Sequence, residues 1–268
     1  MIPQLNRQFQ GLIRFVGVVG LLTLSTTSAS AATFYVSTSG GQVGEVNQST
    51  GNFAQVASGI VYTDIALSQT GDLFGIDFQT LYKIDTQLGT GYLVGSLGAS
   101  LNGLGFTNSN DLYGTGGSGF YKVNAQTGQA SLVSTISGFN SSGDIVYDPT
   151  TNRFLATSVG DSLWSIKTDG TASKIGNIGF VDVYGLAFDD NGTLFGYTAN
   201  RQQIAIDINT GVGIFKQNVV GTNGEIWGSA SSPSTGSAPK SVPEFSSALG
   251  LLAFGLVGGA VRRRYRKN

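Results

Sequence analysis

The sequence predicts an all-β fold, a five-bladed β-propeller closed across its termini, followed by a single C-terminal transmembrane helix. Two observations predict the propeller. Between residues 33 and 230, short apolar or alternating runs are separated by Gly, Asn, Asp and Ser, and no helical periodicity is present. An apolar triplet also recurs about every 40 residues, and units of that length with four strands are typical of propellers.

The repeat is defined by the triplet that opens each unit. Aligned on their last residues (67, 106, 147, 188 and 227), the triplets are spaced by 39, 41, 41 and 39 residues. They are Ile65-Ala66-Leu67, Leu104-Gly105-Phe106, Ile145-Val146-Tyr147, Leu186-Ala187-Phe188 and Glu225-Ile226-Trp227. Second, third and fourth strands follow each triplet, separated by Gly-containing turns, because glycine supplies the positive φ of tight hairpins.

The two ends of the repeat complement one another. The first unit, from Thr33, lacks its first strand, whereas residues 225–228 form a first strand without followers. Joining them completes the fifth blade and removes exposed sheet edges. The blade pattern resembles the NHL and SMP-30-like propeller repeats over nearly the whole middle of the chain. A β-sandwich or a solenoid is the alternative fold.

Residues 1–31 have the pattern of a secretory signal peptide. Arg7 and Arg14 begin it, an apolar core of about ten residues follows, and Ala29 and Ala31 form the cleavage site. We expect cleavage after Ala31 and export of the propeller domain, residues 32–230. A retained signal anchor is the alternative.

The C-terminal part of the chain predicts a tether and an anchor. Residues 231–241 are rich in Ser and Pro, a composition that begins at Ser229 and is typical of flexible linkers. The uncharged segment 246–261 predicts a transmembrane helix that is slightly short and is extended by snorkelling side chains. The basic flank, which should stay cytoplasmic, consists of Arg262, Arg263, Arg264, Arg266 and Lys267.

Residues 242–268 as a whole resemble a known sorting signal. The motif Val242-Pro243-Glu244, an apolar segment and a basic end are similar to the PEP-CTERM signal of Gram-negative bacteria and cyanobacteria. The resemblance implies recognition by an exosortase, a membrane transpeptidase, with the cargo released or attached outside the cell. Phe245 stands where the family usually has a second proline. An ordinary single-pass anchor is the alternative.

Composition excludes several kinds of chemistry. The chain has no Cys and no His, which removes thiolate nucleophiles, imidazole bases and metal sites built from those residues. A metal site would need oxygen ligands, which favour calcium or magnesium. Residues 32–240 hold 15 acidic and 8 basic residues, so the domain is a poor candidate for binding nucleic acid.

Polar residues at the start of the first strands form the candidate site. In a propeller of this type these strands line the central channel, and Thr63, Gly143 and Tyr184 lie at the same rim. The candidate ligand or calcium residues are Asp64, Asn102, Asp144, Asp182, Asn223 and Glu225. Such a ring can hold one calcium ion or bind sugar hydroxyls. The alternative is that these residues cap strand ends and bind channel water.

The leading hypothesis is therefore a non-enzymatic, exported propeller for binding or matrix organisation. Its expected partners are an exosortase-type enzyme, the membrane, and extracellular polysaccharide or another surface protein. No catalytic residue is assigned, and calcium is the one cofactor considered. The alternative is a metal-dependent hydrolase or lactonase built on Asp64, Asp144 and Glu225. We expect the recurring aromatic residues in the core between blades rather than at sugar platforms; they are Tyr35, Tyr113, Tyr121, Trp164 and Trp227.

Overall fold

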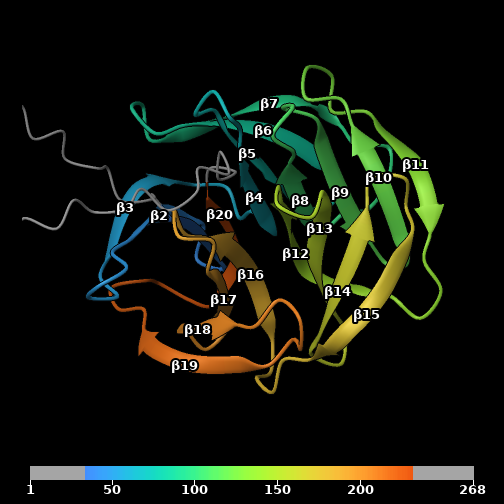
Figure 1. Ribbon diagram of the computed structural model, residues 1–268. Helices are drawn as coiled ribbons and strands as arrows, with labels where there is room; N and C mark the ends of the chain where they lie inside the picture. The colour runs from blue at the N-terminus through green and yellow to red at the C-terminus, as the bar shows by residue number, and fades with distance from the viewer. Residues whose placement is uncertain (1–33, 232–268) are drawn as a thin grey trace, which may run out of the picture. The chain divides into compact units, whose positions relative to one another are not determined.

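The computed structural model describes residues 34–231, which form five four-stranded antiparallel sheets around a central axis (Figure 1). The predicted five-bladed β-propeller is therefore confirmed. The signal peptide, the transmembrane segment and the sorting motif predicted from the sequence lie outside the described residues. Within residues 34–231, no helix is long and apolar enough to cross a membrane.

Each blade runs from an inner strand beside the axis to an outer strand at the periphery. Blade 1 comprises β20 (Ile226–Ser231), β1 (Phe34–Thr38), β2 (Gln42–Val46) and β3 (Phe53–Ser58). Blade 2 comprises β4 (Asp64–Leu67), β5 (Leu73–Ile76), β6 (Thr80–Asp85) and β7 (Thr90–Ser96). Blade 3 comprises β8 (Gly103–Phe106), β9 (Leu112–Gly116), β10 (Gly119–Val123) and β11 (Ala130–Thr135). Blade 4 comprises β12 (Ser141–Asp148), β13 (Arg153–Ser158), β14 (Ser162–Lys167) and β15 (Ala172–Asn177). Blade 5 comprises β16 (Val183–Phe188), β17 (Leu194–Thr198), β18 (Gln202–Ile206) and β19 (Gly213–Asn218).

The ring is closed by pairing of the two ends of the domain. Strand β20 supplies the inner strand of blade 1 and pairs antiparallel with β1, so that Phe34 lies opposite Ser231 and Ser37 opposite Gly228. The predicted closure is confirmed. Because first and last strands share one sheet, the ring cannot open without breaking this ladder.

The predicted register of the last repeat was wrong by four residues. In blade 2 the inner-strand residue Leu67 pairs with Leu73, the first residue of the second strand. In blade 1 the residue that pairs with the first residue of the second strand, Phe34, is Ser231. The triplet equivalent to residues 65–67 is therefore 229–231. Ser231, predicted as the first linker residue, is buried in this strand, and its Oγ accepts the backbone N–H of Phe188 at 3.0 Å. Apolar alignment failed here because this inner strand is built from small, partly polar residues.

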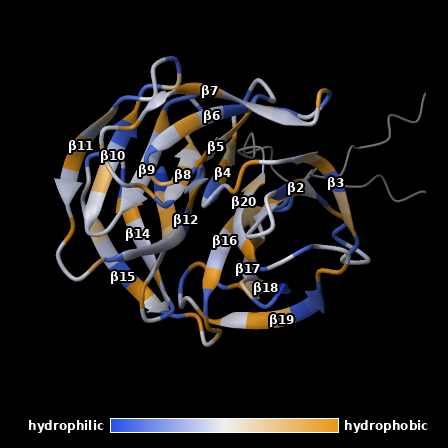
Figure 2. Cartoon of the chain, turned by 180° about the vertical axis from the view of Figure 1, so that it is seen from behind, coloured by the Kyte–Doolittle hydropathy of each residue, from blue (hydrophilic) through white to orange (hydrophobic). Residues whose placement is uncertain are grey.

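The hydrophobic core consists of separate layers between neighbouring blades. The layer between blades 3 and 4 contains Phe120, Phe154 and Tyr113, whose ring centroids lie 5.2–5.8 Å apart. Tyr113 and Trp164 are buried in this layer, as predicted. Apolar segments also mark outer strands such as β11 and β19 (Figure 2), where Leu132 and Ile214 are exposed.

Candidate ligand site at the channel rim

The inner strands place equivalent residues in layers along the channel. The rim layer consists of Thr63, Asn102, Gly143, Tyr184 and Trp227. The layer below it consists of Asp64, Gly103, Asp144, Gly185 and Gly228. Glycine in that second layer makes room for the aspartates, since a Cβ on Gly228 would lie 2.4 Å from Oδ1 of Asp64.

The two aspartates of the second layer, which we call the aspartate pair, join inner strands of different blades. Asp64 Oδ2 accepts the backbone N–H of Leu104 in β8 at 2.6 Å. Asp144 Oδ2 accepts the N–H of Leu186 in β16 at 2.6 Å and the N–H and Oγ–H of Ser229 in β20 at 3.3 and 3.2 Å. The pair therefore links all five inner strands.

Both carboxyl groups of the aspartate pair favour the protonated form. Burial raises the pKa of both carboxyl groups well above the ordinary value, and the charge of Asp144 raises the pKa of Asp64 further. With a proton on one carboxyl group, the pair can form a hydrogen bond between its two side chains. Asp144 Oδ1 is buried without any other donor, so a proton on Asp64 satisfies it.

This burial changes the interpretation of both aspartates. Asp64 and Asp144 are 0% and 1% exposed, so they lie beneath the rim rather than on it, contrary to the expectation from the sequence. Their oxygens bind protein N–H and O–H groups instead of facing a ligand. Within residues 34–231, no group of three or more acidic side chains is placed to hold a metal ion.

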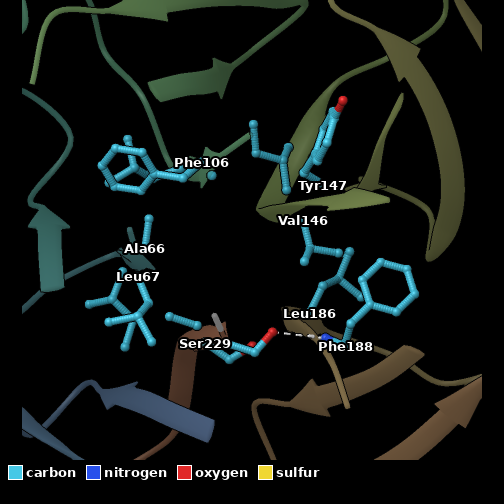
Figure 3. A pocket seen from close by; sticks show the side chains of 14 residues that line it. Ala66, Leu67, Phe106, Val146, Tyr147, Leu186, Phe188 and Ser229 are labelled. Atoms are coloured by element: carbon cyan, nitrogen blue, oxygen red, sulfur yellow. Dashed lines mark hydrogen bonds between the residues drawn. The ribbon is translucent and has the colours of Figure 1, made fainter. Parts of the chain in front are cut away.

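Other hollows in the propeller offer less to a ligand. The channel below the aspartate pair holds a cavity of about 20 Å³ with mostly apolar walls, including Leu67, Phe106 and Val146 (Figure 3), and this is room for about one water. A hollow of about 560 Å³ lies between blades 2 and 3, with β7 residues in its wall, but its Lys83 and Asp72 pair with each other at 2.7 Å.

A pocket of about 260 Å³ opens at the rim above the aspartate pair. We call it the rim pocket; it is lined by Thr63, Phe78, Asn102, Ser142, Gly143, Tyr184, Glu225 and Trp227. Tyr184 and Trp227 have no partner in the β16–β17 and β20–β1 ladders, because each ladder shifts register at that residue. Such bulges redirect side chains, and here they bring two aromatic rings to the pocket.

The polar atoms of these aromatic rings are held by carboxylates. Trp227 Nε1 donates to Glu225 Oε2 at 3.1 Å, and the hydroxyl of Tyr184 donates to Asp182 Oδ1 at 3.0 Å. Burial raises the pKa of Tyr184 to about 12, with the bond to Asp182 as the next cause. The rings are thereby fixed at the rim by partners on their own strands or the loops that precede them.

Phe78 forms part of the pocket wall at a strained position. It lies in the turn between β5 and β6 with φ of 83°, a left-handed conformation that a bulky residue rarely adopts, and its side chain is 47% exposed. The equivalent turns of blades 1 and 3 have Gly41 and Gly117 with positive φ. An exposed aromatic ring at a place that favours glycine is consistent with a functional role.

The structure separates the predicted site residues into three groups. Asn102 and Glu225 line the rim pocket, and Asp182 contacts it through Tyr184. The aspartate pair lies below the pocket. Asn223 does not line it, and its backbone N–H donates to Gln42 Oε1 at 2.6 Å. The register error in the last repeat explains this, because Trp227 and not Asn223 is equivalent to Thr63.

Three residues of the pocket were not predicted, namely Phe78, Ser142 and Trp227. Trp227 was expected in the core, and a correct register for β20 would have placed it at the rim. Phe78 lies in a turn whose backbone conformation depends on the surrounding hairpin. Nothing in its local sequence indicates that its side chain lines a pocket.

Comparison with known proteins shows the fold alone. No protein-family model and no curated protein matches the chain. The chain is similar to a structure from a nidogen–laminin complex (TM-score 0.56, 10% identity, 75% of this chain and 98% of that chain). It is also similar to a Bacteroides thetaiotaomicron protein of unknown function (0.51, 14%, 74% and 62%) and to TolB from Acinetobacter baumannii (0.50, 14%, 75% and 66%). The chain thus spans about two thirds or less of the length of these two bacterial proteins. These likenesses establish a β-propeller.

Proposed function

We propose that this chain is an exported propeller that binds extracellular polysaccharide at the rim pocket without catalysing a reaction. The observation that supports it best is the pair of bulges that bring Tyr184 and Trp227 to the open end of the channel. Aromatic walls with a few polar groups are typical of small-ligand sites. Glu225, which is exposed, supplies a hydrogen-bond acceptor for sugar hydroxyls.

The hydrolase or lactonase alternative finds less support in the same geometry. It would use Asp64, Asp144 and Glu225 together around calcium. The first two are buried and bind inner-strand N–H groups, whereas Glu225 is exposed at the rim and bound to Trp227.

The path of the chain suits display at a surface. Phe34 and Ser231 pair at the end of blade 1 opposite Glu225, so the covalent continuation toward residues 232–268 starts on the face away from the rim pocket. In our proposal the signal peptide exports the chain, and an exosortase-type enzyme processes or anchors the segment 242–268.

Binding is tested by screening the purified domain against an array of oligosaccharides of defined composition. We expect retention on a subset of glycans, lost in Phe78→Ala and Trp227→Ala. Phe215→Ala is the matched control, because Phe215 on β19 is also 47% exposed but lies on an outer strand. No retention of the wild type on any glycan, or equal loss in Phe215→Ala, would overturn the proposal.

Delivery is tested separately by cell fractionation. The full chain is compared with a chain that ends at Ser241 and so lacks the sorting segment. We expect the full chain in the membrane or surface fraction and the shortened chain in the soluble exported fraction. Identical soluble behaviour of both chains would remove the sorting role of residues 242–268 and leave the binding proposal untouched.

A further inference from the structure

The free polar groups of the rim pocket are hydrogen-bond acceptors. Asn102 Nδ2 donates to the carbonyl of Ser141 at 3.1 Å, while its Oδ1 is buried without a partner. Glu225 uses one carboxylate oxygen for Trp227, which leaves the other for a ligand. The hydroxyl of Thr63 donates to the carbonyl of Ile76 at 3.1 Å. A ligand that fits these groups must bring donors.

The aromatic rings of the pocket are suited to a positive charge. Tyr184 and Trp227 each donate their polar hydrogen to a carboxylate, which shifts electron density into the ring and strengthens its attraction for a cation. Phe78 adds a third ring to the same pocket. Two or three aromatic faces beside an acidic group form the arrangement that recognises organic ammonium ions.

The charge around the pocket has the same sign throughout. Glu225 lines the pocket, and the charges of Asp182, Glu225 and Asp161 all act on Tyr184. No Lys or Arg is among the pocket-lining residues of the described chain. Residues 34–231 as a whole contain 15 acidic and 7 basic residues, so the domain attracts cations from a distance.

We propose that the rim pocket selects a positively charged amino sugar, a hexosamine unit with a free ammonium group within a polysaccharide. The ammonium group lies against the faces of Tyr184 and Trp227 and donates to Glu225, while the ring hydroxyls face Thr63 and Ser142. A volume of about 260 Å³ is slightly below that of drug-sized ligand sites and suits one sugar unit. This inference rests on the proposed polysaccharide-binding function and specifies its ligand.

The test is calorimetric titration of the domain at pH 6 and low salt with two oligosaccharides of equal length. One is a glucosamine hexamer and the other an N-acetylglucosamine hexamer, which has the same linkage but no charge. We expect the glucosamine hexamer to bind about tenfold more tightly or better. Added NaCl should weaken that binding, because the charges at the rim are partly exposed.

Matched variants locate the source of the preference. Glu225→Gln keeps an acceptor for Trp227 but removes the charge, so the preference for glucosamine should fall about fivefold or more. Glu45→Gln is the control, because Glu45 is also an exposed glutamate of blade 1 and also accepts an aromatic side-chain donor, the hydroxyl of Tyr35 at 3.1 Å. Near-ultraviolet circular dichroism checks that both variants are folded.

The outcomes separate this inference from the function on which it rests. Equal binding of both hexamers, or an unchanged preference in Glu225→Gln, overturns the amino-sugar inference and leaves polysaccharide binding in place. Binding of neither hexamer, combined with retention of neutral glycans on the array, also overturns it. Hexalysine that binds as tightly as the glucosamine hexamer would show recognition of charge alone, which contradicts a sugar site.

Discussion

The raised pKa values of the aspartate pair predict an unusual dependence of stability on pH. Asp64→Asn replaces one carboxyl group with an amide that can donate to Asp144 Oδ1 and accept from Leu104 without titrating, although the N–H of Ile65 loses its acceptor, which lowers stability equally at every pH. The wild type keeps a proton in the folded state that the unfolded chain has lost, since the ordinary pKa of an aspartate is about 3.9. A raised folded pKa gives stability that is complete below the unfolded pKa and is lost as pH rises toward the folded pKa.

The magnitude follows from one proton retained on folding. The free energy of unfolding falls by about 1.4 kcal/mol per pH unit for each proton that only the folded state holds. Between pH 5 and pH 7 the wild type should therefore lose up to about 2.7 kcal/mol through the aspartate pair, while the pKa of the pair stays above the pH. The free energy of unfolding of Asp64→Asn should not show this fall between pH 5 and pH 7.

Urea unfolding at pH 5, 6 and 7 measures the slope for wild type and variants. Asp207→Asn is the matched control, because backbone N–H groups of Asn209 and Thr210 lower the pKa of Asp207. The stabilisation that comes from the Asp207 carboxylate is present above the unfolded pKa and is lost only as pH falls below about 4. Asp207→Asn should therefore show the same fall in the free energy of unfolding between pH 5 and pH 7 as the wild type. Asn124 occupies the equivalent turn position in blade 3, which shows that asparagine fits there.

Two results would refute this reasoning. If wild type and Asp64→Asn lose stability in parallel from pH 5 to pH 7, the folded protein retains no proton at the pair. If Asp64→Asn is less stable than wild type by more than about 3 kcal/mol at every pH, the site needs a second charge rather than a retained proton.

Three further predictions follow from the closure and the rim. Ser231→Ala leaves the buried N–H of Phe188 without its acceptor and should lower the free energy of unfolding by about 1–3 kcal/mol in urea titrations, whereas Ser49→Ala in an exposed turn should change it little. A chain that ends at Gly224 lacks β20 and should lose cooperative thermal unfolding, while one that ends at Ser241 should keep it; equal melting curves would argue against closure. Phe78→Gly relieves a left-handed conformation and should stabilise the fold by about 1 kcal/mol while weakening glycan binding; a less stable variant would show that the position is not strained.

Much of the fold is accessible from local pattern. Spacing near 40 residues, short apolar strands and glycine turns predict five blades, and the incomplete first and last units predict closure. These features are local because each blade is one chain-continuous sheet, except where β20 joins β1. The signal peptide and the sorting segment are likewise predictions from local pattern, and they lie outside the described residues.

The site is less accessible, because its residues are assembled from all five blades. The sequence indicates that the start of each inner strand faces one rim, and Asn102 and Glu225 do line the pocket there. It does not indicate that β20 is shifted by four residues, since serine and alanine replace the apolar triplet. That shift decides that Trp227 rather than Asn223 lies at the rim.

The sequence by itself therefore determined the architecture of this protein, because strand length, turn chemistry and repeat spacing are properties of neighbouring residues. Only the tertiary structure decided the roles of the polar residues. Asp64 and Asp144 are 80 positions apart, and the charge of Asp144 raises the pKa of Asp64 because the ring brings their strands to one axis. Two register shifts within ladders, which no local pattern specifies, decide that Tyr184 and Trp227 line the rim pocket rather than the core.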